Sequence, residues 1–210
     1  MIAAYNQEFT VYRDIFANRS AFFRGDQRCT KDRSKPLLLE GERPGTFDMY
    51  LHCLYHNEVP KCVQTLDDDR LTGSTVYGAD WKFIILIDLY TLANKLIDPT
   101  TANMVIDEIR ELGQKDHTPG SDAIEFAFDY SDDADKLRSL LADFYIFDKN
   151  ATYSESDGNY PRAFLDLVVE RFLRLRDSGY IVVKSSLLKT AGEDRQWARD
   201  EYHQKVEEEV

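Results

Sequence analysis

Two histidines four residues apart are the first residues in this sequence whose types and spacing could do chemistry. His52 and His56 lie in a stretch with helical spacing, so they would share one helix face and could offer two imidazoles to a metal ion. The acidic run Asp67–Asp69 could add carboxylate ligands. Together these residues would suit one function class, a small metal-dependent hydrolase.

Other features of the same residues count against a metal site. No third ligand at a standard zinc spacing accompanies His52 and His56, and the run Asp67–Asp69 lacks the alternating order and distal glutamate of a calcium loop. The sequence also contains no glycine-rich phosphate loop, no GxSxG and no HExxH motif. We therefore predict no catalytic residue, no metal and no cofactor, and keep the hydrolase as the alternative.

The charge balance narrows the choice of partners. The chain has 210 residues, with 38 acidic against 26 basic side chains and a formal net charge of -12. Such a charge repels phosphate backbones and anionic lipid, so we expect neither nucleic acid nor a membrane as a direct partner. The longest apolar run, Phe83–Ile87, is far short of a membrane span, and the start of the chain has no signal-peptide pattern.

The three cysteines indicate a reducing environment. Cys29, Cys53 and Cys62 form no CxxC pair and no zinc-type cluster, so we interpret them as reduced structural thiols. We therefore expect an intracellular protein, in the cytoplasm, the nucleus or both.

The elements that must position these side chains begin with a small sheet. Residues 8–12 alternate between polar and apolar and predict a strand, with residues 2–5 as a short hairpin partner. Two short helical turns follow, and the second carries the adjacent Phe22 and Phe23. Residues 36–41 predict a further strand.

The rest of the chain has helical spacing. Thr46, Asp80, Asp98, Ser121 and Ser131 have side chains that can cap a helix N-terminus. Gly113 can end the helix that Asp98 begins. The predicted helices cover residues 47–55, 81–97, 99–112, 122–130, 132–147 and 161–178. This order, a small sheet followed by a helical bundle, predicts an α+β fold.

Four motifs in this order resemble a known family. They are "FTVYRDIFANRSAFF", "LLLEGERPGTFDMYLHCLYHNEVP", "LYTLANKLI" leading into "NMVIDEI", and "FDYSDDADKLRSLLADFY". The chain resembles the BTB/POZ domain, in particular the BTB-domain proteins common in fungi, from Phe9 to Phe147. The resemblance implies a BTB/POZ-like small β-sheet flanked by a helical bundle. A helical extension would then occupy residues 116–180 after a BTB/POZ-like domain at 1–115. An acidic tail at 181–210 would be loosely docked or disordered.

The resemblance implies a non-catalytic protein–protein interaction module. Such a module could form a homodimer, pair with another BTB protein or act as an adaptor to a cullin-based ubiquitin ligase. Tyr55 matches the family's helix-end tyrosine, which lies near the cullin surface in members that bind one. In the family, aromatic residues such as Phe22 and Phe23 pack between sheet and helices. The predicted interaction residues are Phe22, Phe23, Tyr50 and Tyr55.

The chain also departs from the family pattern. Tyr12 and Arg13 stand where the family has histidine and lysine, and the usual first strand is missing or reduced to residues 2–5. The segment Arg24–Lys35 has no apolar-x-Glu triplet, which cullin-binding members often carry there. A third hypothesis follows from the short first strand. The chain could be a regulator that pairs with a full-length BTB relative.

Overall fold

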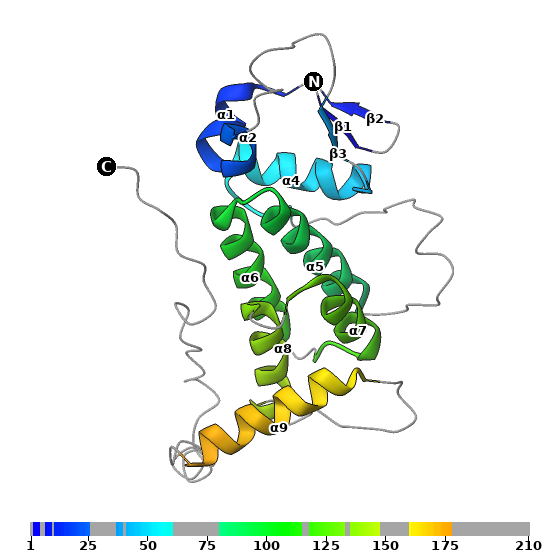
Figure 1. Ribbon diagram of the computed structural model, residues 1–210, viewed down its shortest axis with the longest axis vertical. Helices are drawn as coiled ribbons and strands as arrows, with labels where there is room; N and C mark the ends of the chain where they lie inside the picture. Colours follow the sequence, from blue (N-terminus) through cyan, green and yellow to red (C-terminus); the bar gives the residue numbers. More distant parts are fainter. Residues whose placement is uncertain are drawn as a thin grey trace. The chain divides into compact units, whose positions relative to one another are not determined.

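A computed structural model describes residues 2–4, 7–9, 11–25, 37–39, 41–60, 80–114, 118–132, 135–147 and 160–177 (Figure 1). The chain divides into two compact units, and the boundary between them follows Ile109. The first contains the sheet, the first helices and most of α6; the second contains the remaining helices. The elements of the first unit are β1 (Ile2–Ala4), β2 (Gln7–Phe9), α1 (Arg13–Arg19), α2 (Ala21–Gly25), β3 (Leu37–Leu39), α4 (Pro44–His56), α5 (Asp80–Lys95) and α6 (Pro99–Gln114), whose last residues belong to the second unit.

The three described strands form a small sheet in the order β2-β1-β3. β1 pairs antiparallel with β2, with Ile2 opposite Phe9 and Ala4 opposite Gln7. It pairs parallel with β3, with Ile2 opposite Leu37. The short segment near the start of the chain is therefore the central strand of the described sheet. β2 ends at Phe9, so the predicted strand at 8–12 was placed too far along the chain.

An aromatic cluster joins the sheet to the helices that follow it. Phe9, on β2, packs edge-on against Phe47 of α4 at 4.9 Å between ring centroids. Phe16, on α1, contacts Phe23 of α2 at 4.7 Å and Tyr50 of α4 at 6.1 Å. All five rings are buried. Because aromatic residues bury large apolar areas, this cluster fixes the helical hairpin α1–α2 against α4.

α4 begins earlier than its predicted cap. Its N-cap is Arg43, with Pro44 at the first helical position, where the missing N–H of proline costs no hydrogen bond. Thr46 therefore lies inside the first turn and does not cap the helix. Its hydroxyl donates instead to Asp88 of α5 at 2.5 Å, and Arg43 Nη1 contacts the same carboxylate oxygen at 3.5 Å. These bonds link α4 to α5, which is buried along most of its length.

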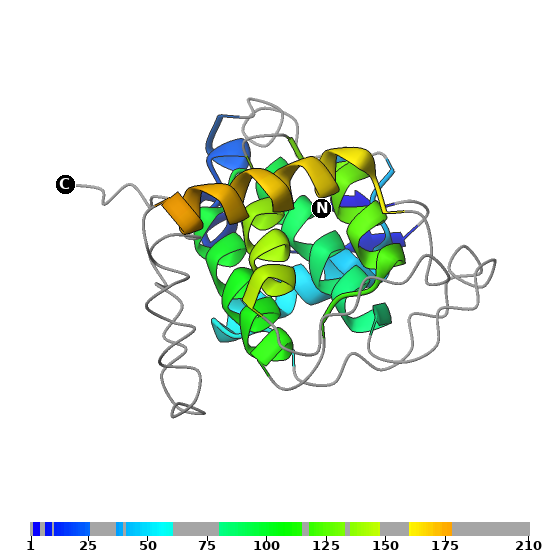
Figure 2. The ribbon, with the colours of Figure 1, turned by 90° about the horizontal axis from the view of Figure 1, so that it is seen from below.

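The second unit contains α7 (Ser121–Tyr130), α8 (Lys136–Phe147) and α9 (Arg162–Asp177). α9 crosses α7 and α8, as the yellow and orange ribbon in Figure 2 shows. The ring of Phe164 on α9 is buried and contacts Phe128 on α7 at 5.7 Å and Tyr145 on α8 at 5.0 Å. Tyr145 also donates to the carbonyl of Pro119 at 2.5 Å. Aromatic packing thus holds these helices together.

Three predicted helix boundaries in α6 to α8 were wrong. Gly120, not Ser121, occupies the N-cap of α7. Ser131 is the C-cap of α7 and does not cap α8, whose Leu137 N–H bonds to Asp135 Oδ1 at 2.8 Å. α6 continues past Gly113, where a Cβ would collide with the ring of Phe144. Gly113 therefore serves close packing and not helix termination.

The predominance of helix in the predicted α+β fold is confirmed. Among the described helices, none has both the length and the apolar character needed to cross a membrane. The predicted acidic tail at 181–210 lies outside the described residues, as do Cys29, Cys62 and the acidic run Asp67–Asp69.

Candidate protein-interaction surface

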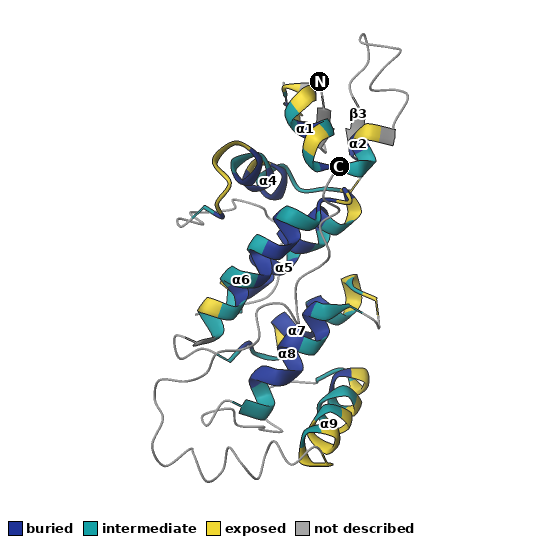
Figure 3. Cartoon of the chain, turned by 90° about the vertical axis from the view of Figure 1, so that its left-hand side faces the viewer, coloured by how far each residue is buried: buried dark blue, intermediate teal, exposed yellow. Residues whose placement is uncertain are grey.

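The two faces of α4 differ sharply in exposure. Tyr50, Cys53 and Leu54 are buried on one face. On the other, Tyr55 and His56 are exposed near the end of the helix. Figure 3 shows that α4 has both buried and exposed parts. Tyr50 and Tyr55 are five residues apart, about 140° around a helix, so they cannot share a face. The outer end of α4, where Tyr55 and His56 are exposed, can therefore contact a partner.

Two tyrosines form the exposed aromatic part of this surface. Tyr12, just before α1, is 75% exposed, and Tyr55 is 42% exposed. The backbone N–H of Tyr12 donates to the hydroxyl of Tyr55 at 3.4 Å, a long bond that still places the two residues together. Tyrosine is enriched in protein interfaces because it has an apolar ring with a polar end. We call Tyr12 and Tyr55 the tyrosine pair.

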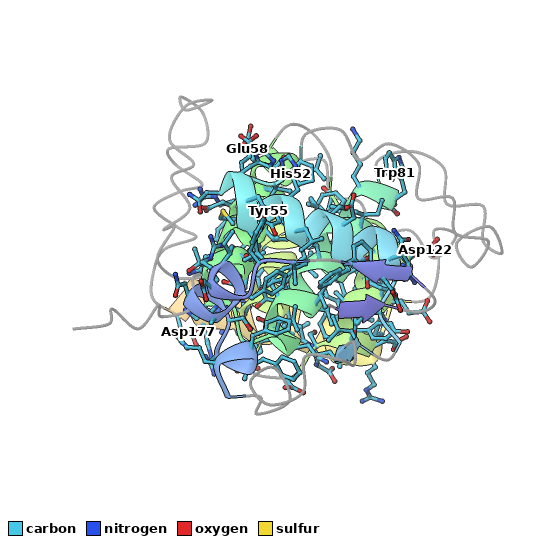
Figure 4. The ribbon with its side chains drawn as sticks, turned by 90° about the horizontal axis from the view of Figure 1, so that it is seen from above. His52, Tyr55, Glu58, Trp81, Asp122 and Asp177 are labelled. Carbon is cyan, nitrogen blue, oxygen red and sulfur yellow. The ribbon has the colours of Figure 1, made fainter. Side chains whose placement is uncertain are left out.

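The two histidines lie beside the tyrosine pair on α4. The His52 and His56 rings are 4.4 Å apart between centroids, and His52 Nε2 lies 3.8 Å from Glu58 Oε1. Figure 4 shows His52 and Glu58 next to each other at the outer end of the helix, with Tyr55 one turn away. His56 is exposed and adds a polar group to this surface, whereas the Nε2 atom of His52 is buried and has no hydrogen-bond partner among the described residues.

A polar network behind the surface fixes the end of α4. Asn57 ends the helix in the left-handed region, at φ 54°, which asparagine tolerates better than most residues. Its side-chain oxygen accepts from Arg19 Nη1 at 3.2 Å. Arg19 also donates to the Thr101 hydroxyl at 3.0 Å and lies 3.6 Å from the carboxylate of Asp98. One guanidinium thus connects α1 to both α4 and α6.

Asp98 is the buried centre of this network. Its Oδ1 accepts the backbone N–H of Thr101 at 3.0 Å, which confirms the predicted cap of α6. Its Oδ2 accepts the hydroxyls of Thr101 at 2.7 Å and Tyr50 at 3.1 Å. Burial, and then the negative charge of Asp98, raise the pKa of the Tyr50 hydroxyl far above its ordinary value. Tyr50 therefore stays protonated and acts as a donor to Asp98.

The turn between α5 and α6 contains a strained residue. Ile97 has φ 53°, in the left-handed region that a β-branched side chain rarely adopts, and it is exposed. The turn lets the N–H of Asp98 bond to the carbonyl of Ala93 at 2.9 Å, and the Ile97 carbonyl accepts from Ala21 at 3.2 Å. The Ser20 hydroxyl, which is buried, donates to the carbonyl of Leu96. The turn is thereby tied to the α1–α2 junction.

Cys53 has no reactive character. It is buried beside Tyr50, and burial raises the pKa of its thiol to about 12. A thiol in this state is neither a good nucleophile nor a good metal ligand. It fills space in the core, as we predicted for a structural thiol.

The predicted interaction residues divide into exposed and buried ones. Tyr55 is exposed and Phe22 is half-buried, so both can reach a partner. Phe23 and Tyr50 are buried in the aromatic cluster, so we remove them from the candidate surface. Phe23 instead packs α2 against α1, and the Tyr50 hydroxyl donates to Asp98.

His52 and His56 do not form part of a metal site in the described part of the chain. Within those residues, no group of three or more His, Cys, Asp or Glu side chains is placed to hold a metal ion. The Asp67–Asp69 run, which the hydrolase alternative also needs, lies outside them. The hydrolase alternative therefore stays an untested prediction.

Sequence reasoning missed three residues of this surface and its network. Asn57 carried a signal, because asparagine directly after a predicted helix often ends it in the left-handed conformation. Tyr12 was noted only as a departure from the family motif. Arg19 carried no signal, since its partner Thr101 lies 82 residues away.

Comparison of the chain with models of protein families, with curated proteins and with solved structures finds no match.

Proposed function

We propose that this chain is a non-catalytic protein-interaction module of BTB/POZ type, whose contact surface is the tyrosine pair at the end of α4. The observation that carries the proposal is the exposure of Tyr55 on a helix whose other face is buried. Tyr55 is also the position that matches the family's helix-end tyrosine.

The order of elements supports the BTB/POZ part of the proposal. The resemblance implies a strand that leads directly into a helical hairpin with aromatic residues between sheet and helices. β2 is followed by α1 and α2, and Phe9, Phe16 and Phe23 belong to one buried aromatic cluster with α4. This arrangement supports the proposal that these motifs belong to a BTB/POZ-type fold.

The rigidity behind the tyrosine pair supports its use as a contact surface. The end of α4 is held from two sides, because Asn57 accepts a hydrogen bond from Arg19 and Tyr50 donates one to Asp98. A side chain held in place before binding loses less conformational entropy on contact with a partner. Tyr55 is therefore a good candidate for a residue that contributes strongly to binding.

A cullin N-terminal domain is the first partner to test. We expect isothermal titration calorimetry on the full chain, against a panel of cullin N-terminal domains and a full-length BTB protein, to give a 1:1 complex with at least one of them. Tyr55→Ala should weaken that complex by roughly 30-fold, as for a residue worth about 2 kcal/mol.

Another exposed tyrosine provides the matched control. Tyr130, at the end of α7, is also exposed, so Tyr130→Ala removes the same side-chain atoms at a different place and should leave affinity unchanged. Absence of binding to every cullin domain and to the BTB protein would overturn the proposal. Equal losses from Tyr55→Ala and Tyr130→Ala would overturn the assignment of the surface.

A further inference from the structure

α9 has an apolar stripe that stays exposed beside the described helices of its own unit. Phe164 and Arg171 lie on the face that packs against α8, where Arg171 bonds to the carboxylate of Asp143. Around the helix from that face, Val169 is 58% exposed, Phe172 45% and Leu173 39% (Figure 3). Residues three and four apart are neighbours on a helix surface, so these three side chains are contiguous. We call them the α9 stripe.

Charged residues of opposite sign border the two ends of the stripe. Asp166 precedes Val169 by three residues, and Arg176 follows Leu173 by three. Both are well exposed, and among the described residues each forms a local ion pair in which neither partner is buried: Asp166 with Arg162 at 3.7 Å and Arg176 with Asp177 at 2.9 Å. Such exposed pairs contribute little and can be exchanged for others.

This spacing makes the stripe complementary to itself. In an antiparallel pair of α9 helices centred on Arg171, Val169 of one chain lies opposite Leu173 of the other. Asp166 then lies opposite Arg176 of the second copy, twice by symmetry, and the two Phe172 rings meet near the axis. A parallel pair would place each charge against its own copy. The charge pattern therefore favours α9 of a second copy as the partner of the stripe, and it favours the antiparallel orientation.

We propose that the α9 stripe is a self-association surface that binds the same stripe of a second copy of this chain in antiparallel orientation. The proposal rests on α9 alone and is independent of the BTB/POZ assignment and of the tyrosine pair. The contact is small, since three apolar side chains per copy form its centre, so we expect a dissociation constant on the order of 100 µM.

The test is sedimentation equilibrium of the full chain from about 5 to about 500 µM, a range that brackets this constant. We expect the wild type to pass from monomer to dimer. Phe172→Ser and Asp166→Arg should each weaken the dimer by about tenfold or more, through lost apolar contact and through charge repulsion. The exchange Asp166→Arg with Arg176→Asp should restore the dimer, because it recreates both cross-chain pairs.

A charge pair outside the stripe on the same helix provides the matched control. Glu170 and Arg174 form an ion pair at 2.5 Å, and they lie roughly 110° and 150° around the helix from the middle of the stripe. The exchange Glu170→Arg with Arg174→Glu changes as many charges on α9 and should leave the dimer intact. Far-UV circular dichroism on every variant confirms that the helices are retained.

Three outcomes would overturn the proposal. One is a wild type that stays monomeric at the highest concentration. Another is a dimer that Phe172→Ser and Asp166→Arg leave unchanged. The last is hydrogen exchange at Val169 and Phe172 that is slow to the same extent at all concentrations, which would mean that another part of the chain covers the stripe. None of these outcomes changes binding to a cullin domain, so failure here is distinguishable from failure of the proposed function.

Discussion

Each unit contains a buried aspartate, and the two are stabilised in different ways. Asp98 in the first unit accepts a backbone N–H and two hydroxyls, with the Arg19 guanidinium 3.6 Å away. Asp143 in the second unit accepts two bonds from the guanidinium of Arg171, at 2.7 and 2.5 Å. The side chains of both aspartates are almost fully excluded from water.

The difference shows what each aspartate does. Neutral donors from the backbone and from hydroxyls have no alternative partner in the core, so Asp98 is needed to satisfy them. The bonds from Arg171 to Asp143 join two opposite charges, and the net contribution of such a pair is reduced by the cost of burying both charges. We expect Asp98 to be irreplaceable and the Asp143–Arg171 pair to be replaceable as a unit.

Asp98→Ala should produce the largest effect. It leaves the Tyr50 hydroxyl and the Thr101 N–H without an acceptor and removes the cap of α6, so we expect a loss of about 3–5 kcal/mol in the free energy of unfolding. Urea denaturation followed by circular dichroism measures it. Asp98→Asn keeps one acceptor oxygen and should lose less; equal losses would show that the charge, and not the set of bonds, matters.

Arg171→Leu should have the next largest effect. It leaves the buried carboxylate of Asp143 without its guanidinium, at an expected loss of about 2–3 kcal/mol, reduced because Arg171 is partly exposed. The double variant Asp143→Leu with Arg171→Leu removes both charges and should be more stable than Arg171→Leu alone. A double variant less stable than the single one would contradict the comparison drawn above.

Tyr50→Phe tests one donor of the Asp98 network. It removes a hydroxyl and keeps the ring, so we expect a loss of about 1 kcal/mol at neutral pH.

The same substitution has a pH signature. The folded protein raises the pKa of Tyr50, and that of Cys53 to about 12 from an ordinary value of 9.0. Both groups then ionise more readily in the unfolded chain, so stability is full below pH 9 and falls as pH rises toward 12. In urea titrations across this range, Tyr50→Phe should show a shallower fall than the wild type. An identical slope would mean that Tyr50 ionises as easily folded as unfolded.

Asn57→Gly should have the smallest effect. Glycine adopts the left-handed conformation of Asn57 without strain, so only the part-exposed bond to Arg19 is lost, at less than about 0.5 kcal/mol. Asn57→Ala loses the same bond and adds left-handed strain of about 1 kcal/mol. Thermal melts of the two variants separate these effects, and equal melting temperatures would show that the backbone at residue 57 is unstrained.

The sequence predicted features whose causes lie close together in the chain. Asp98 followed by Pro99 indicated a cap, and the cap exists, because an aspartate side chain reaches only the next few backbone N–H groups. The predictions that Thr46 and Ser131 cap helix N-termini were wrong for a related reason. Short polar side chains favour helix starts in general, but Pro44 set an earlier start for α4, and Ser131 lies at the end of α7.

The candidate surface could be predicted only in part. Tyr55 was identified from a motif and is exposed, whereas Tyr50, from the same motif, is buried. Helical spacing alone would have separated them, since they differ by about 140°. The bond between Tyr12 and Tyr55 joins residues 43 apart in sequence, and no local pattern predicts such a contact.

The bond from Arg19 to Thr101, across 82 residues, also has a consequence for synthesis on the ribosome. At about 5–20 residues per second, Thr101 is made roughly 4–16 s after Arg19. For most of that interval Arg19 lacks Asp98, and Tyr50, once made, lacks it until 48 further residues have been added. We therefore expect the network that connects α1, α4 and α6 to form only after the beginning of α6 has left the exit tunnel.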